Sequence, residues 1–371
     1  MAGPVLMADG AMERTGLGRI ETVARRVLSE AVDDTSVGPV SVAALLDGGS
    51  ACFIIPRDGN AGGSVGIRDR FLVYSITKTF IAAAVLRLAQ KGALDVDGPV
   101  SGWLPDVPNA RLFTPRHLMS HTSGLPDYGG LEAYHRAVLA SEPAWTPERY
   151  FSETKSDRLL FRPGEGWAYS NIGYMVLRLL LEKLTGASFA DALAGLVLEP
   201  SGLSDTFVAG DADLASLAFG QGPWFGEAAE TAVARRYSVG WVAHGVAAST
   251  AKDVARFYHE LFRGDFLSKE QLDAMIRLRI FPAIAGRPYK SPGYGLGIQA
   301  EAAFPGGPAY GHTGGGPGAC GCCFTAMGPN ERVTVAVLMA GEAAPVAERI
   351  VLETLRTLCM GETYRGLSIS P

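Results

Sequence analysis

Apolar runs near the two ends of the chain have the spacing of strands, whereas the middle of the chain carries amphipathic helical patterns. Strand-like runs are found at residues 40–46, 318–327 and 333–339. Helical patterns flank them at about 20–32 and 344–358. Because the strands come from both ends, the pattern predicts an α/β sandwich that is interrupted by an inserted segment.

The inserted segment is predicted to be helical. Its helices are expected at residues 79–90 (ended by Gly92), 115–120, 147–153, 172–184 (ended by Gly186), 189–198 and 251–262. A chain of 371 residues exceeds the usual size of a single core. We therefore expect a discontinuous α/β subdomain at 1–70 and 285–371 and a mainly helical subdomain at 71–284, with the active site at their interface.

Composition narrows the classes of function. The net charge of −5 gives no sign of nucleic-acid binding, and no apolar run approaches the ~20 residues of a membrane helix. The first nine residues lack the basic start and long apolar stretch of a secretory signal. The sequence therefore predicts a cytoplasmic protein without nucleic-acid or membrane partners, and it leaves the oligomeric state open.

Three of the five cysteines, Cys320, Cys322 and Cys323, form a cluster after a Gly-rich stretch. A metal site that also uses His312 is one interpretation, but no spacing in this chain matches a tetrahedral zinc motif. Cysteine also behaves as a small buried hydrophobe. We therefore expect these residues to alternate between the two faces of a strand, and the odd count fits a reducing compartment.

The first candidate for chemistry is Ser75, which lies three residues before Lys78 in a strongly apolar setting. In a helix, residues i and i+3 share a face, so the lysine amine is expected beside the serine hydroxyl. Burial disfavours the charged form of lysine, and a neutral amine activates a serine as a nucleophile. The alternative interpretation is a plain buried helix cap at Ser75.

The same S-x-x-K pattern occurs twice more, at residues 152–155 and 249–252. The first of these lies among charged residues and is expected to be a solvated face. In the second, Ser249 or Thr250 is expected to cap a helix. Only Ser75 is apolar on both sides, which singles it out among the three.

Two further stretches carry groups that suit acyl transfer. Tyr169 and Asn171 precede an amphipathic helix, and a tyrosine near a lysine ammonium is expected to have a lowered pKa. Such a tyrosine accepts and returns protons, while the asparagine amide accepts from the lysine and donates to a substrate carbonyl. The second stretch is 312–318, a Gly-rich segment that could offer a backbone N–H to an oxyanion. Taken alone, each stretch also fits an ordinary turn.

Together, these motifs resemble the serine β-lactamase and penicillin-binding-protein family. The branch that fits holds class C β-lactamases, D-stereospecific aminopeptidases and amidases, DD-carboxypeptidases and family VIII esterases. The stretches 118–126 and 294–297 agree as well, and the resemblance runs from about residue 40 to about residue 338. It implies a β-lactamase/transpeptidase-like fold, with an antiparallel sheet flanked by helices and an all-helical inserted subdomain.

The resemblance also implies residue roles. Ser75 matches the nucleophile, Lys78 its activating partner, and Tyr169 the general base and acid. Substrate is expected to contact Asn171, His312, Thr313, Gly314 and Gly315, with the N–H groups of Ser75 and Gly315 forming the oxyanion hole. His121 and Asp127 are conceivable as additional catalytic groups, and of the two His121 is expected to be structural, because the family uses the stretch 118–126 to end a helix under the site. No cofactor or metal is implied, and the order in which Lys78 and Tyr169 take the first proton is left open.

One position departs from the β-lactamases, which carry lysine where this chain has His312. A mostly neutral histidine is expected to hold a substrate carboxylate less firmly than lysine, and to gain charge as the pH falls toward 6. This favours a serine hydrolase or acyltransferase acting on a small ester, amide or peptide substrate, whose specificity is set by loops at 220–229 and 280–292. The alternatives are a β-lactamase, a sensor that is acylated and turns over poorly, and an inactive scaffold, which would normally show a broken motif.

Overall fold

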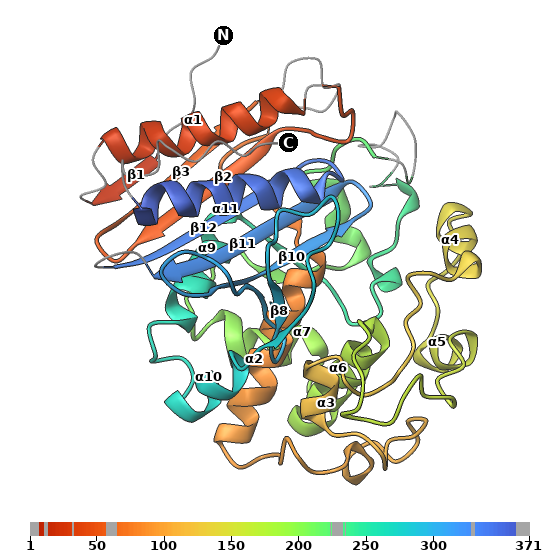
Figure 1. The fold of residues 1–371 in the computed structure, drawn as a ribbon. Coiled ribbons are helices and arrows are strands. Elements are labelled where there is room, and N and C mark those ends of the chain that lie inside the picture. Colours follow the sequence, from red (N-terminus) through yellow and green to blue (C-terminus); the bar gives the residue numbers. More distant parts are fainter. Residues whose placement is uncertain are drawn as a thin grey trace.

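The computed structural model describes residues 7–10, 14–31, 33–56, 65–222, 224, 233, 235–327 and 331–360. Its largest element is a nine-stranded antiparallel sheet in the order β1-β3-β2-β12-β11-β10-β9-β8-β7 (Figure 1). The strands are β1 (Met7–Gly10), β2 (Val40–Leu46), β3 (Gly49–Ile55), β7 (Arg279–Ile280), β8 (Pro292–Tyr294), β9 (Gln299–Glu301), β10 (Ala309–Gly316), β11 (Ala319–Met327) and β12 (Arg332–Met339). Because β2 pairs with β12, the two ends of the chain meet at the centre of the sheet.

Helices cover both faces of this sheet. The described α-helices are α1 (Arg14–Glu30), α2 (Thr77–Gln90), α3 (Pro115–Met119), α4 (Glu132–Leu139), α5 (Pro147–Glu153), α6 (Asn171–Thr185), α7 (Phe189–Leu193), α9 (Ala251–Leu261), α10 (Lys269–Met275) and α11 (Ala344–Met360). Helices α1 and α11 lie side by side over one face, and α9 packs on the other face against β2, β11 and β12 (Figure 1). Among the described helices, none has the combination of length and apolar character needed to cross a membrane.

The alternation of side chains along β11 divides the interior into two cores. Cys320 and Cys322 belong to the core between the sheet and helices α1 and α11. Cys323 belongs to the core on the opposite face, which it shares with α2, α6 and α9. All five cysteines are buried thiols that form no disulfide. The expectation that this cluster alternates between the faces of a strand is confirmed.

The fold class predicted from the sequence is confirmed, and the predicted helices and strands agree with the observed ones to within a few residues at most ends. The helix expected at 189–198 is α7 followed by a π-helical turn, Ala194–Leu198. The expected loop at 280–292 joins β7 to β8, whereas most of 220–229 lies outside the described residues. The division into subdomains stays a prediction, and α9, which lies within the 71–284 segment, packs on the sheet.

A small second sheet fixes the segment that leads into Ser75. It has the order β4-β6-β5, in which β4 (Phe71–Leu72) pairs with β6 (Ala247–Ser249), and β5 (Phe207–Val208) pairs with the other side of β6. Just beyond β4, Val73 N–H donates to Ala247 O at 2.9 Å. In return, Ala247 N–H donates to the Thr77 hydroxyl at 3.0 Å. The chain around Ser75 is therefore held from both sides before α2 begins.

Candidate active site

Ser75 lies in a short 3-10 helix, Tyr74–Ile76, that leads directly into α2. The preceding residue, Tyr74, has φ of 41°, which a non-glycine residue rarely adopts. Its hydroxyl donates to Pro317 O at 2.7 Å, so the turn that presents Ser75 is tied to the end of β10. Ser75 remains partly exposed while the residues on both sides of it are buried. Ser75 is therefore the one partly exposed residue in the otherwise buried stretch 71–80.

Two proton-bearing groups meet the Ser75 hydroxyl. Lys78 Nζ lies 3.0 Å from Ser75 Oγ, and the Tyr169 hydroxyl donates to the same oxygen at 2.9 Å. The lysine is fully buried, and burial lowers its pKa to about 7, with the negative charge of Asp127 opposing the shift. Close to neutral pH, a sizeable fraction of Lys78 is therefore an uncharged amine that can accept a proton.

Tyr169 differs from the sequence-based expectation. Its pKa is raised rather than lowered, because burial of the hydroxyl outweighs the hydrogen bond to Ser75, and the charge of Asp127 raises it further. Lys78 does lie 5.0 Å from the centre of the Tyr169 ring, but this contact does not reverse the effect of burial. The prediction of a lowered tyrosine pKa is wrong for this structure, and Tyr169 is a neutral phenol that donates its proton.

The start of α6 positions both Tyr169 and Asn171. Ser170 caps the helix by accepting from Gly173 N–H at 3.0 Å, which fixes the backbone between Tyr169 and Asn171. Asn171 Oδ1 then accepts from Lys78 Nζ at 2.7 Å. Asp127 fixes the amide in that orientation, since its carboxylate accepts from Asn171 N–H at 2.7 Å and from Asn171 Nδ2 at 3.2 Å. Asn171 was expected to accept from the lysine and to donate to a substrate carbonyl. The structure contains the first of these contacts, and one of the two amide hydrogens faces Asp127.

His121 packs against the segment that carries Tyr169 and Asn171. It follows α3 in a left-handed conformation with φ of 58°, and its Nδ1 accepts from Ser170 N–H at 3.1 Å. Its ring lies 4.3 Å from the ring of Tyr169. Burial holds the pKa of His121 well below its ordinary value, with the positive charge of Lys78 as a smaller cause. Its contacts are therefore those of a neutral residue that positions Tyr169.

The Gly-rich motif is part of strand β10, and close packing explains two of its glycines. A Cβ on Gly314 would lie 2.1 Å from Val73 O and 3.0 Å from Ser75 N, and one on Gly316 would enter the Tyr74 ring at 2.4 Å. Because real Cβ atoms do not approach so closely, only glycine lets β10 lie against the Ser75 segment. The alternative interpretation of this motif as a simple turn is therefore wrong.

Gly315 lies at an open edge of the sheet. Strand β9 pairs with β10 only along Ala309–Gly311, and beyond that point Thr313 N–H donates to the side chain of Gln299 at 3.0 Å. Alternate residues of an antiparallel strand direct their N–H groups to the same edge, so Gly315 N–H points past the end of β9. Gly315 is exposed, and its neighbour Gly314 lies against Ser75 N. This arrangement suits an oxyanion hole that is formed by two backbone N–H groups.

The side chains of His312 and Thr313 are engaged within the protein. His312 is fully buried, with Nε2 3.1 Å from the Tyr294 hydroxyl and Nδ1 2.7 Å from Thr313 O. Burial lowers its pKa to about 3, helped by the charge of Lys78. The expectation that His312 gains charge near pH 6 is therefore wrong. The Thr313 hydroxyl donates to Glu348 Oε1 at 2.7 Å, on the face of the sheet covered by α11.

The other two S-x-x-K stretches do not combine a serine with a buried lysine and a tyrosine. Ser152 and Lys155 are both exposed, and Lys155 lies beyond the end of α5 with φ of 54°. In the third stretch, Thr250 is the residue that caps α9, and Lys252 is exposed. The structure brings a buried lysine and a tyrosine together only at Ser75, among these three described serines.

One neighbour of Lys78 was missed from the sequence. His244 Nε2 lies 3.2 Å from Lys78 Nζ, in the turn between a 3-10 helix, Val239–Trp241, and β6. It stands 166 residues after Lys78 in the chain. No local motif surrounds this residue, and only the pairing of β6 with β4 brings it to the site.

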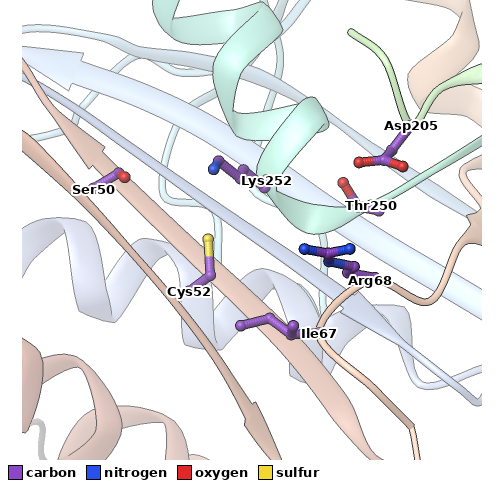
Figure 2. A pocket seen from close by; sticks show the side chains of 7 residues that line it. All are labelled: Ser50, Cys52, Ile67, Arg68, Asp205, Thr250 and Lys252. Atoms are coloured by element: carbon purple, nitrogen blue, oxygen red, sulfur yellow. The ribbon is translucent and has the colours of Figure 1, made fainter. Parts of the chain in front are cut away.

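A cavity elsewhere on the molecule is separate from this site. Figure 2 shows it, with a volume of about 330 Å³ and a lining made of Ser50, Cys52, Ile67, Arg68, Asp205, Thr250 and Lys252. Ser50 and Cys52 belong to β3, and β2, β12 and β11 stand between that strand and β10. The cavity therefore shares no lining residue with the Ser75 site.

Comparisons with known proteins agree with the geometry. Penicillin-binding protein 4* of Bacillus subtilis is 28% identical over 309 residues, which cover 79% of this chain and 66% of that protein. Esterase EstB of Burkholderia gladioli is 34% identical over 160 residues, 40% of this chain and 41% of the esterase. The matched segments thus span two thirds or less of these relatives' own lengths.

The fold has close counterparts among solved structures. The D-amino acid amidase of Ochrobactrum anthropi SV3, complexed with D-phenylalanine, superposes with a TM-score of 0.73 at 23% identity, covering 91% of this chain and 99% of the amidase. The family model described as Beta-lactamase matches residues 24–355, nearly the whole chain. The resemblance predicted from the sequence motifs is therefore confirmed, and the chain belongs to the Beta-lactamase family.

Proposed function

We propose that this protein is a serine hydrolase or acyltransferase that works through an acyl-enzyme on Ser75. The observation that carries the proposal is the pair of contacts on Ser75 Oγ, from a buried lysine at 3.0 Å and from a tyrosine hydroxyl at 2.9 Å. A serine becomes a useful nucleophile only beside a base, and both groups lie within reach of its proton.

The proton path follows from the two pKa shifts. Uncharged Lys78, whose pKa lies at about 7, takes the proton of the Ser75 hydroxyl while Oγ attacks the carbonyl carbon of an ester or amide. Tyr169, which is a neutral phenol, then gives its proton to the leaving alcohol or amine as the acyl–leaving group bond breaks, and it regains a proton from Lys78. Water, or another nucleophile, attacks the acyl-enzyme in the second half of the reaction by the reverse path.

The remaining groups hold this arrangement in place. Asn171 and Asp127 fix the Lys78 amine beside Ser75. The carbonyl oxygen, which becomes negative in the transition state, would bind the N–H groups of Ser75 and Gly315. Such donors are worth roughly 10²–10³ in kcat when one is removed from a comparable site. In this proposal His312 and Thr313 contribute through their backbone and through the packing of β10.

Substrates are proposed from the relatives and from the charge of the site. The relatives are named as an esterase, a penicillin-binding protein and a D-amino acid amidase, so esters and D-amino acid amides are the first candidates. The neutrality of His312 argues against tight binding of the carboxylate that penicillins and cephalosporins carry. A β-lactamase or a slowly turning over penicillin sensor is therefore the second choice.

Intact mass spectrometry tests the proposal directly. The protein is mixed with nitrophenyl esters, D-amino acid amides and a cephalosporin, and the mass added to Ser75 identifies the acyl group that is accepted. An enzyme continues to release nitrophenol after the first turnover, whereas a sensor shows one burst per site and then stops.

The substitution Ser75→Ala should reduce turnover by roughly 10³-fold or more, because only binding and the oxyanion hole remain. Ser152→Ala and Ser249→Ala are matched controls, since they alter the first residue of the same pattern elsewhere, and both should retain activity. Equal residual turnover in the Ser75 variant and in the controls would refute the assignment of the nucleophile.

A further inference from the structure

His244 is a buried histidine that belongs to none of the sequence motifs. Its side chain is 2% exposed, and it is held in a tight turn in which Gly245, with φ of 79°, donates to Val242 O at 2.7 Å. Three residues later, Ala247 is bonded to Val73 and Thr77 on either side of Ser75. The position of His244 relative to the nucleophile is therefore set by backbone hydrogen bonds and not by a mobile loop.

The amine of Lys78 has three neighbours that can accept a hydrogen bond. They are Ser75 Oγ at 3.0 Å, Asn171 Oδ1 at 2.7 Å and His244 Nε2 at 3.2 Å. An ammonium group has three N–H donors, so these three acceptors match it fully. His244 is the third of them, and it is the one for which the sequence offered no signal.

The count changes when the lysine is uncharged, because an amine has two N–H donors and one lone pair. Asn171 Oδ1 can only accept, so it takes one N–H. If His244 Nε2 takes the other, the lone pair is left facing the Ser75 hydroxyl. We propose that His244 is a positioning residue, which accepts an N–H from Lys78 and thereby directs the Lys78 lone pair at the proton of Ser75.

The surroundings of His244 support this role. An acceptor at Nε2 requires a neutral ring with its proton on Nδ1. The ring interacts with the backbone of Tyr74, and Nδ1 itself has no partner at ordinary hydrogen-bond geometry within the described residues. Burial holds the pKa of His244 well below its ordinary value, and the charges of Lys78 and Arg178 add to the effect. The lowered pKa favours the neutral ring that the acceptor role requires.

The pH dependence of acylation separates this role from simple packing. The titratable groups that face the pair, besides His244 and Lys78 themselves, are Asp127, Tyr169, Tyr174, His121, His312 and Arg178. A neutral acceptor stabilises the ammonium form of Lys78, so its removal should lower the pKa of the lysine. The loss of one hydrogen bond to a charged group corresponds to a shift of about one pH unit.

The experiment rests on the proposed function and measures the rate of Ser75 acylation by a nitrophenyl ester between pH 5 and 9. In His244→Leu the plateau rate should fall about tenfold or more, since the lone pair is no longer directed. At the same time, the acid limb, which is the part of the pH–rate profile where the rate falls as Lys78 becomes protonated, should move to a pH lower by about one unit. Asparagine is polar but too short to reach Lys78, so His244→Asn should show the same two changes. It takes the place of His244→Leu if the leucine variant fails to fold.

His244→Gln and His259→Leu are the controls. Glutamine has a longer side chain than asparagine and can place its amide oxygen near the position of Nε2, so His244→Gln should restore the acid limb and most of the rate. His259 is another buried histidine, bonded to Asp47 and Thr334, and its loss should leave the pH profile unchanged. A fall in rate with an unmoved acid limb in both His244→Leu and His244→Asn would overturn the proposal. If wild-type protein formed no Ser75 adduct, the proposed function itself would fail first.

Discussion

The sharpest test of the site is a pair of substitutions at adjacent glycines on β10, Gly314→Ala and Gly315→Ala. The two changes are chemically identical and lie one residue apart, on opposite faces of the same strand. A methyl group on Gly314 would point at the segment that carries Ser75, at 2.1 Å from Val73 O. A methyl group on Gly315 would meet Cys320 Cβ at 3.6 Å and Ala344 Cβ at 3.8 Å, which are ordinary contacts.

The magnitudes follow from these distances. Val73 O is a backbone atom whose residue is also bonded to Ala247, so it cannot swing away as a flexible side chain could. Either β10 or the Ser75 segment must shift by about 1 Å, and overpacking of this kind costs about 1–3 kcal/mol. A displacement of that size at the reacting centre can also cost about 10²-fold in rate. For Gly315→Ala we expect a change in stability within about 0.5 kcal/mol and activity within a few-fold, because the backbone N–H is kept.

The assay has two readouts, the midpoint of urea unfolding and kcat/KM for one nitrophenyl ester. Gly314→Ala should lose stability and activity together, whereas Gly315→Ala should keep both. The reasoning would be refuted if the two variants behaved alike, or if Gly314→Ala retained full activity. In either case β10 would not lie against Ser75 as closely as the structure has it.

Three further predictions concern protons. Lys78→Ala and Tyr169→Phe should each cost nearly as much activity as the double variant, because both act in one proton-transfer step; losses that multiply would show independent roles. In wild-type protein, kcat/KM should fall as the pH drops through about 7, where Lys78 becomes protonated and can no longer accept the Ser75 proton. His312, whose pKa is about 3, should stay neutral, so a neutral and an anionic substrate with the same acyl group should give parallel profiles from pH 5 to 8. A selective gain in kcat/KM for the anionic substrate near pH 6 would show that His312 becomes protonated and recognises the charge of the substrate.

Much of the fold follows from local patterns in the sequence. The boundaries of β2 were predicted to the residue, because its run of small and apolar residues is buried on both faces and Ser41 is its one polar member. The end of α6 was predicted from Gly186, which has φ of 65° and stops the helix. Strand β3 was missed, although most of it is the apolar run at 51–55; it pairs with β2 along seven residues and with β1 on its other side.

The site was partly predictable for the same reason. Ser75 and Lys78 are three residues apart, so one helical turn places them together, and local sequence contains that information. Tyr169 meets Ser75 across 94 residues, and the family resemblance supplied that pairing where spacing could not. The direction of the Tyr169 and His312 pKa shifts depends on how deeply each group is covered by segments distant in sequence. Neither shift could be read from the chain, and both expectations were wrong.

Burial also explains why a single proton dominates the chemistry of this site. The rings of His121, His244 and His312 all lie near Lys78, and in each case burial is the largest cause of a lowered pKa and the lysine charge is a further one. The coupling is reciprocal, so any histidine that did charge would push the proton off Lys78. Lys78 therefore competes for the proton with three histidines that are weaker bases. When the site carries one proton, that proton is on Lys78. In the proposed mechanism, the three histidines therefore act as neutral acceptors and packing partners, and the protonation of Lys78 decides whether Ser75 is a resting hydroxyl or a nucleophile.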